Sequence, residues 1–215
     1  MIKGFLFDLD GVIVDTAVYH YQAWRRMANE LGFDISEEFN ETLKGISRMD
    51  SIARILEHGK VSLPEERILE LAKLKNEWYL EEVEKMTSAN VLPGIQELIS
   101  QLKAGGYKIS LGSASKNAPK ILERIGLAPE FDAIVDGNSV KKSKPDPEVF
   151  IKGAEALNLK NEECLVIEDA FAGIEAAHAA GMKAIGIGTK ENLPNADLIL
   201  ASFEEVKLED LLKEL

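Results

Sequence analysis

The sequence has very few of the residues that mark several common classes of protein. It contains one cysteine, Cys164, which excludes an internal disulfide and a cysteine-rich zinc site. Because Cys164 lies within an apolar run typical of a strand, we interpret it as a buried structural thiol rather than a catalytic one. No apolar stretch approaches the ~20 residues that a membrane-spanning helix needs, so we expect no membrane span.

Basic residues are also scarce relative to acidic ones. The 215 residues include 25 Lys and Arg against 37 Asp and Glu, a net charge of −12. This excess argues against binding to nucleic acid through a basic face and against binding to anionic membranes. It does not argue against a small anionic substrate, because a few lysines and a bound metal set a local positive field. The N-terminus lacks the pattern of a secretory signal, so we expect a cytoplasmic protein, and we expect a monomer because no obligate partner surface is indicated.

The first fifteen residues combine a short apolar run with two acids. Residues 2–7 are typical of a buried parallel strand, and Asp8 and Asp10 follow directly. The carboxyl ends of strands in open α/β sheets are where ligands bind, and a spacing of two directs both side chains to one side. Gly11 allows a sharp turn there. Since two crowded carboxylates repel, we expect a divalent cation held by oxygen ligands between them.

The rest of the chain divides into a helical block and an alternating block. Residues 17–87 show helical spacing without a convincing strand, and Ser62 with Glu65 resembles a capping box that begins a long helix. From residue 92 onward, strands alternate with helices, which predicts a parallel sheet with right-handed crossovers. We therefore predict an α/β fold, a doubly wound parallel sheet formed by residues 1–14 and 89–215, with an all-helical cap domain inserted at residues 15–88.

The expected elements of the core follow from this alternation. The expected strands lie at residues 2–7, 108–111, 133–135, 163–167, 183–187 and 198–200. The expected helices lie at residues 95–104, 118–125, 143–157, 170–180 and, more weakly amphipathic, 208–215.

Three further polar groups belong to the same pattern: Ser113 and the pair Glu168-Asp169 follow predicted strands, and Lys144 stands where a predicted helix opens. With the two N-terminal aspartates they can converge at one edge of the sheet. They are the residue types that phosphoryl transfer needs, namely a nucleophile, metal ligands, a hydroxyl donor and a cation. Each also has an ordinary interpretation: Ser113 as a helix cap, Lys144 as a solvated lysine, and the acid pair as a partner of a helix dipole.

Residues 8–16, Asp-Leu-Asp-Gly-Val-Ile-Val-Asp-Thr, resemble the signature of the haloacid dehalogenase-like (HAD) phosphotransferases, and the later polar groups follow in that superfamily's order. The resemblance implies a Rossmann-like HAD core. It implies that Asp8 is a nucleophile that accepts phosphate and that Asp10 is a general acid and base. The implied Mg²⁺ ligands are the side chains of Asp8, Glu168 and Asp169 and the backbone carbonyl of Asp10.

The predicted cap narrows the resemblance. Residues 16–24, 43–51 and 113–117 resemble the β-phosphoglucomutase family. The implied reaction interconverts β-D-glucose 1-phosphate and β-D-glucose 6-phosphate through an aspartyl phosphate, with glucose 1,6-bisphosphate as intermediate and activator. The residues that this resemblance places around a sugar phosphate are Thr16, His20, Trp24, Lys44, Gly45, Arg48, Ser51, Lys75, Ser113, Ala114, Ser115, Lys116, Asn117 and Lys144.

Several of these residues are assigned specific tasks by the same resemblance. Arg48, with residues 115–117, would grip the phosphate that does not react, since a guanidinium binds phosphate oxygens bidentately. Thr16 and His20 would orient the general acid. Lys144 would offset the repulsion between the nucleophile and the incoming phosphate.

Alternatives stay open at this point. Trp24 lies on the apolar face of its helix, so a place in the cap core is at least as reasonable as contact with a sugar. A lone histidine near a helix start, such as His20, is usually structural. HAD phosphatases share the core residues, so a sugar-phosphate phosphatase is the alternative enzyme, and a non-catalytic sugar-phosphate sensor is the alternative from another class.

Overall fold

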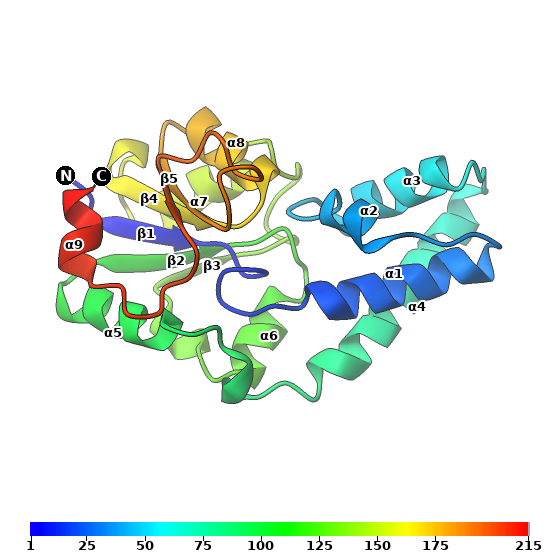
Figure 1. Cartoon of the computed structure of the whole chain (residues 1–215), viewed down its shortest axis with the longest axis horizontal. Helices are drawn as coiled ribbons and strands as arrows, with labels where there is room; N and C mark the ends of the chain where they lie inside the picture. The colour runs from blue at the N-terminus through cyan, green and yellow to red at the C-terminus, as the bar shows by residue number, and fades with distance from the viewer. Residues whose placement is uncertain (215) are drawn as a thin grey trace.

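The computed structural model describes residues 1–214 and shows two lobes side by side (Figure 1). One lobe is helical and consists of α1 (Ala17–Glu30), α2 (Glu37–Glu41), α3 (Arg48–His58) and α4 (Glu65–Val83). The other contains the strands β1 (Gly4–Phe7), β2 (Lys108–Gly112), β3 (Ala133–Val135), β4 (Cys164–Glu168), β5 (Lys183–Ile187) and β6 (Leu198–Leu200). Its helices are α5 (Ile95–Ala104), α6 (Ala118–Arg124), α7 (Glu148–Ala156), α8 (Phe171–Ala179) and α9 (Leu208–Lys213), with short 3-10 turns η1 (Ser88–Asn90), η2 (Ala128–Glu130) and η3 (Asn161–Glu163).

The sheet is parallel throughout, with the strand order β3-β2-β1-β4-β5-β6. The chain leaves β1 toward β2 and β3, and then returns to the other side of β1 to form β4. A crevice opens at such a reversal, outside the carboxyl ends of the two strands that flank it. Here those strands are β1 and β4, in a register that pairs Phe7 with Ile167. The predicted doubly wound parallel sheet is therefore confirmed.

Alternate side chains of β1 point to opposite faces of the sheet, and each face has its own helices. Phe5 and Phe7 are buried in a cluster with residues of α5, α6 and α9, whereas Leu6 is buried in a cluster with residues of α7 and α8. Burial of one such side chain contributes about 1.5–3 kcal/mol. Because β1 is covered on both faces, it is a rigid base for the residues that follow it.

The helical lobe has a separate apolar cluster, which includes Trp24, Met27, Ile52 and Leu71. The long helix α4 packs along α1, as predicted from helical spacing. The predicted capping box is wrong: α4 begins at Glu65, Pro64 occupies the N-cap position, and no side chain caps the helix. Proline holds an extended backbone there, so Ser62 stays outside the helix.

Two other predicted boundaries differ from the structure. The segment 143–147 forms turns instead of the first turn of a helix, and α7 starts only at Glu148. The tail helix ends at Lys213, and Leu215, which the prediction included, lies outside the described residues.

The two crossings between the lobes lie next to each other. Val14 forms an antiparallel bridge with Val91, and the Leu92 amide donates to the Ile13 carbonyl at 2.9 Å. A helical insertion with adjacent ends is thus visible in Figure 1. The division at residues 14/15 and 88/89 stays a prediction.

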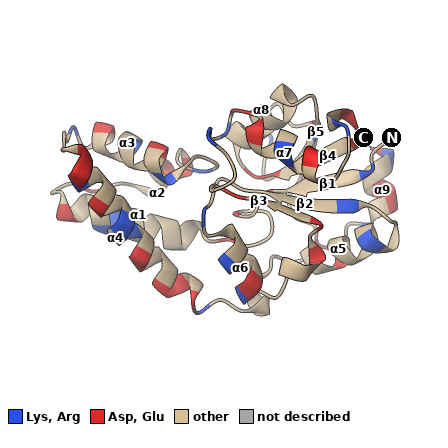
Figure 2. Ribbon diagram, turned by 180° about the vertical axis from the view of Figure 1, so that it is seen from behind, with Lys and Arg blue, Asp and Glu red and all other residues tan. Residues whose placement is uncertain are grey.

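Acidic and basic residues are distributed over both lobes, and on α4 and α6 the two signs alternate (Figure 2). Among residues 1–214, none of the helices combines the length and the hydropathy that crossing a bilayer requires.

Candidate active site

Asp8 is the residue that follows β1, and the sheet register places it beside the end of β4. Its side chain is buried, and Lys144 Nζ lies 2.6 Å from its Oδ1 atom. The same ammonium group lies 2.7 Å from Glu168 Oε1 at the end of β4. Lys144 is therefore buried between two carboxylates from different strands, and its interpretation as a solvated loop lysine is wrong.

A cluster of three carboxylates forms at this point. Oxygen atoms of Asp8, Glu168 and Asp169 all lie within 4.8 Å of one another, a spacing suited to one metal ion. Gly11 adopts a positive φ of 78°, and a Cβ atom there would overlap the Asp169 carboxylate. The glycine predicted to permit a turn therefore also lets an acid approach the loop. The ligands are oxygen atoms only, which fits Mg²⁺ or another hard cation.

The predicted metal set included Asp10, whose side chain is outside this cluster. Its expected contribution through the backbone carbonyl stays a prediction.

Burial dominates the electrostatics of the cluster. It raises the pKa of Asp8 to about 7, although Lys144 opposes the shift and Glu168 adds to it. Burial, with the charges of Glu168 and Asp8, also raises the pKa of Asp169 well above its usual range. Burial alone lowers the pKa of Lys144, but the neighbouring carboxylates reverse this and the net shift is upward. Crowded acids of this kind are stabilised when a cation binds among them.

Asp10 is held by the start of the helical lobe. The Thr16 hydroxyl donates a hydrogen bond to Asp10 Oδ1, and Thr16 Oγ1 lies 3.1 Å from the Tyr79 hydroxyl on α4. Burial raises the pKa of Asp10, and the Thr16 hydrogen bond opposes that shift. A carboxyl group with a raised pKa and a fixed orientation is suited to general acid and base catalysis. Thr16 thus contacts Asp10, and its role in orienting that acid during a reaction stays a prediction.

His20 lies next to a buried lysine. Its Nδ1 atom is 2.7 Å from Lys75 Nζ, and Lys75 also lies 4.3 Å from the centre of the Trp24 ring. Burial, reinforced by nearby positive charge, lowers the pKa of both His20 and Lys75 well below their usual values. No described hydrogen bond joins His20 to Asp10. The proposal that His20 helps to orient Asp10 therefore stays a prediction. Trp24 is 2% exposed in the cap core, and its contact with a sugar stays a prediction too.

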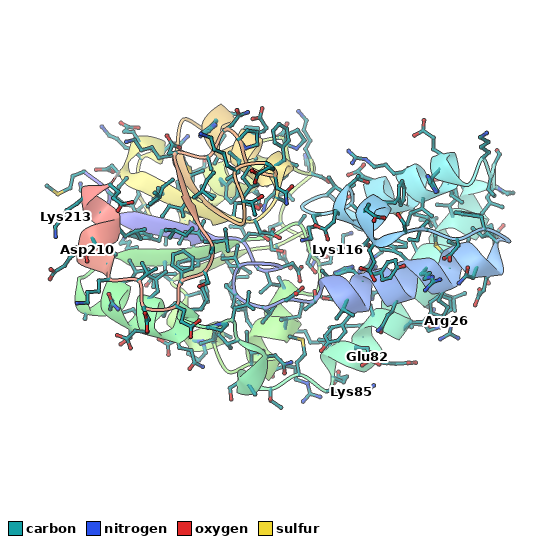
Figure 3. The ribbon with its side chains drawn as sticks, in the orientation of Figure 1. Arg26, Glu82, Lys85, Lys116, Asp210 and Lys213 are labelled. Atoms are coloured by element: carbon teal, nitrogen blue, oxygen red, sulfur yellow. The ribbon has the colours of Figure 1, made fainter. Side chains whose placement is uncertain are left out.

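The loop after β2 carries Ser113 and residues 115–117, which were predicted to bind phosphate. The hydroxyl of Ser113 accepts from the Ser115 amide at 3.1 Å, and that of Ser115 accepts from the Asn117 amide at 3.2 Å. These turns end at α6, for which Asn117 is the N-cap residue. Ala114 is half-buried within the same turn, and Lys116 is exposed on the side of the core that faces the helical lobe (Figure 3).

The helical lobe meets this loop through Arg48. Its Nη2 atom donates to Asn76 Oδ1 at 2.7 Å, and the Asn117 side-chain amide donates to the same oxygen at 2.8 Å. Arg48 and Asn117 therefore lie on either side of one acceptor, although they come from different lobes. Burial lowers the pKa of Arg48, but a guanidinium remains charged at neutral pH. The two donors predicted to grip one phosphate are together.

Two of the remaining predicted residues, Lys44 and Gly45, lie against the core lobe. Lys44 Nζ is 3.4 Å from Asp169 Oδ2 and 2.8 Å from Glu41. Gly45 has a φ of 73°, and a Cβ atom there would lie 3.3 Å from the Cβ of Ala170. Ser51 is 4% exposed, and its hydroxyl donates to the Ser47 carbonyl of its own helix. Its predicted contact with a sugar stays a prediction.

Two residues of the site escaped the assignment from the sequence. They are Tyr79, whose hydroxyl contacts Thr16, and Asn76, whose side-chain oxygen accepts from Arg48 and Asn117. Tyr79 follows Lys75 by four positions, so both lie on one face of the helix, which is a signal that could have found it.

Comparison with known proteins agrees with this geometry. A family model described as haloacid dehalogenase-like hydrolase matches residues 5–187. The chain belongs to the haloacid dehalogenase-like hydrolases. Within this family it is 42% identical to a β-phosphoglucomutase of Bacillus subtilis (strain 168), over 99% of this chain and 95% of that protein. It is also similar to a crystal structure of a β-phosphoglucomutase from Clostridium difficile, with 46% identity, a TM-score of 0.96 and coverage of 100% of this chain and 97% of that one.

The HAD family also includes phosphatases that resemble this chain. A phosphorylated carbohydrates phosphatase of Thermotoga maritima is 30% identical over 100% of this chain and 98% of that protein. Relatives with both kinds of name therefore match almost the whole of this chain.

Proposed function

We propose that this HAD protein is a phosphomutase that interconverts β-D-glucose 1-phosphate and β-D-glucose 6-phosphate. The observation that carries the proposal is the presence of two separate polar clusters between the lobes, one around Asp8 and one around Arg48. A phosphatase needs only the first, whereas a bisphosphate intermediate needs both. The high identity to β-phosphoglucomutases over almost the whole chain supports the same conclusion.

The first half of the reaction would take place at the end of β1. An Asp8 carboxylate oxygen attacks the phosphorus of the 1-phosphate of glucose 1,6-bisphosphate, the bond between that phosphorus and the bridging sugar oxygen breaks, and Asp10 gives its proton to that oxygen, which releases glucose 6-phosphate. Lys144, which lies 2.6 Å from Asp8, offsets the negative charge of the incoming phosphate. When bound by the three carboxylates, Mg²⁺ would neutralise charge on the transferring group.

The second half reverses these bonds on a different hydroxyl. The 6-hydroxyl of β-glucose 1-phosphate gives its proton to Asp10 and attacks the phosphorus carried by Asp8, the bond from phosphorus to Asp8 breaks, and glucose 1,6-bisphosphate forms. Glucose 1,6-bisphosphate is therefore both the intermediate and the compound that phosphorylates a resting enzyme. While one phosphate reacts at Asp8, Arg48 and Asn117 would hold the other, because the two lie within reach of one oxygen.

All residues in this scheme come from one chain, so a monomer is sufficient for activity. The alternative is a sugar-phosphate phosphatase, in which water takes the place of the second hydroxyl. The 30% identity to the Thermotoga maritima phosphatase supports that alternative, less strongly than the 42% identity to the Bacillus subtilis β-phosphoglucomutase supports the mutase.

A coupled assay separates the two enzymes. The protein is given β-glucose 1-phosphate, Mg²⁺ and a trace of glucose 1,6-bisphosphate, and glucose 6-phosphate and inorganic phosphate are measured in parallel. We expect glucose 6-phosphate to be the main product. Release of phosphate at the rate of substrate consumption would establish the phosphatase instead.

The variant Asp8→Asn tests the nucleophile. It removes the negatively charged oxygen but keeps the shape of the side chain, so we expect no detectable turnover and an unchanged circular dichroism spectrum. Retained activity in this variant would refute the assignment.

A further inference from the structure

One direct hydrogen bond joins the two lobes beside the buried lysine. The Ser143 hydroxyl, from the loop between β3 and α7, donates to Asp50 Oδ2 on α3 at 2.7 Å. The two residues are 93 positions apart in the chain. Neither residue belongs to the sets around the two phosphate groups.

Each partner is next to a residue of the proposed site. Ser143 directly precedes Lys144, whose ammonium group contacts Asp8 and Glu168. Asp50 lies in the first turn of α3, two residues after Arg48. The bond therefore links the loop of the buried lysine to the helix that carries the phosphate-binding arginine.

Asp50 is held in place on its own side of the contact. Its amide donates to the hydroxyl of Ser47, the N-cap residue of α3, at 3.2 Å, and that hydroxyl donates back to Asp50 Oδ2 at 2.6 Å. Burial raises the pKa of Asp50, but the hydrogen bonds from Ser47 and Ser143 outweigh it and the net shift is downward. One ionised oxygen thus accepts two hydroxyl groups, one from each lobe.

Other contacts along the same edge close the lobes over the acids. Lys44 reaches Asp169 at 3.4 Å, and the backbone of Gly45 packs against Ala170. The side chain of Asp50 is exposed, so its bond with Ser143 is at the rim of this seam. Exposed polar contacts contribute little to the stability of a fold, which leaves positioning as the effect of this bond.

We propose that Asp50 and Ser143 are positioning residues that keep the lobes closed while Asp8 carries a phosphoryl group, so that the group passes to a sugar hydroxyl and not to water. The inference rests on the proposed function. In either outcome the bond between Asp8 and phosphorus breaks, a bond from phosphorus to the attacking oxygen forms, and Asp10 takes the proton. A looser seam admits water to the same position, which changes the ratio of the two products.

The variant Ser143→Ala removes the bond between the lobes and leaves the Ser47–Asp50 cap of α3 intact. Ser139→Ala is the matched control, because the Ser139 hydroxyl donates to Asp136 at 2.8 Å within the core lobe alone. Ser143→Thr restores a hydroxyl. The readout is the ratio of inorganic phosphate to glucose 6-phosphate formed from β-glucose 1-phosphate with Mg²⁺ and glucose 1,6-bisphosphate.

We expect Ser143→Ala to raise this ratio about three- to tenfold, the effect of losing one hydrogen bond of ordinary strength at an exposed site. Ser139→Ala should leave the ratio at the wild-type value, and Ser143→Thr should restore most of it. In an Asp50→Ala background, Ser143→Ala should add no further change, because its partner is already gone. An unchanged ratio in Ser143→Ala, or an equal change in the Ser139 control, would overturn the inference.

A second measurement does not depend on the reaction. Small-angle X-ray scattering of the proteins without substrate should give a larger radius of gyration for Ser143→Ala than for wild type and Ser139→Ala. If the wild-type protein forms no glucose 6-phosphate, the proposed function fails, and the scattering still decides whether this bond holds the lobes together. Equal radii for all three proteins would refute the contact.

Discussion

Replacing Gly173 by alanine tests how the Glu168 carboxylate is held. Gly173 lies in α8, and a Cβ atom at this position would overlap the carboxyl group of Glu168. Alanine normally stabilises a helix by about 1 kcal/mol relative to glycine, so local propensity alone predicts a more stable protein. The overlap predicts the opposite, because a buried carboxylate would have to move.

The size of the effect follows from the bonds that Glu168 makes. Its two oxygens accept from Lys144 Nζ at 2.7 Å and from the Ala170 amide at 2.7 Å. Each hydrogen bond to a charged group contributes about 1.5–3 kcal/mol. With the helix gain subtracted, we expect Gly173→Ala to lower the free energy of unfolding by about 2–5 kcal/mol. The Mg²⁺ concentration for half-maximal activity should also rise, since a proposed ligand is displaced.

The assay is urea unfolding followed by circular dichroism, with a Mg²⁺ titration of activity. Gly153→Ala is the control. Gly153 lies on α7, where a Cβ would crowd the Leu6 side chain at 2.9 Å, and the nearest atoms belong to Leu6 and Ser110, not to an acid of the cluster. That variant should lose stability without a change in the Mg²⁺ requirement. The reasoning is refuted if Gly173→Ala is as stable as wild type and has the same Mg²⁺ requirement.

Two further predictions concern a hydroxyl and a thiol. Thr16→Val removes the hydroxyl that donates to Asp10. We expect kcat to fall about 10²-fold or more, the usual contribution of a positioned acid or base, and KM to change little. A large rise in KM with unchanged kcat would contradict this. Burial raises the pKa of Cys164 to about 11, so the folded protein keeps this proton at pH values where the unfolded chain loses it. Stability should therefore fall as the pH rises from about 8.5, the usual thiol pKa, to about 11, and this loss should be smaller in Cys164→Ala in urea unfolding at several pH values.

The chemistry of the site was largely predictable from local patterns. Asp8 and Asp10 stand out because two acids directly follow a run of apolar residues, and the sequence order of Ser113, Lys144 and Glu168 completed the family signature. The elements of the core were predictable for the same reason, since strands buried on both faces are continuous apolar runs and three of the four helices between them, α5, α6 and α8, are followed closely by a glycine. The predictions were wrong at the ends of some helices. Ser62 was predicted as the N-cap of α4, but Pro64 occupies that position.

The sequence by itself determined the residue types, the order of strands and helices along the chain, and the acidic residues at the ends of the strands. Only the tertiary structure decided the strand order that puts Asp8 beside Glu168, and the contact of Asp50 with Ser143 across 93 positions. The physical reason is that periodicity reports which face of one element is buried, whereas a contact between elements depends on how several faces pack together. Tyr79 shows the difference, because its apolar ring was evident from helical spacing and its hydroxyl contact with Thr16 required the packed lobes.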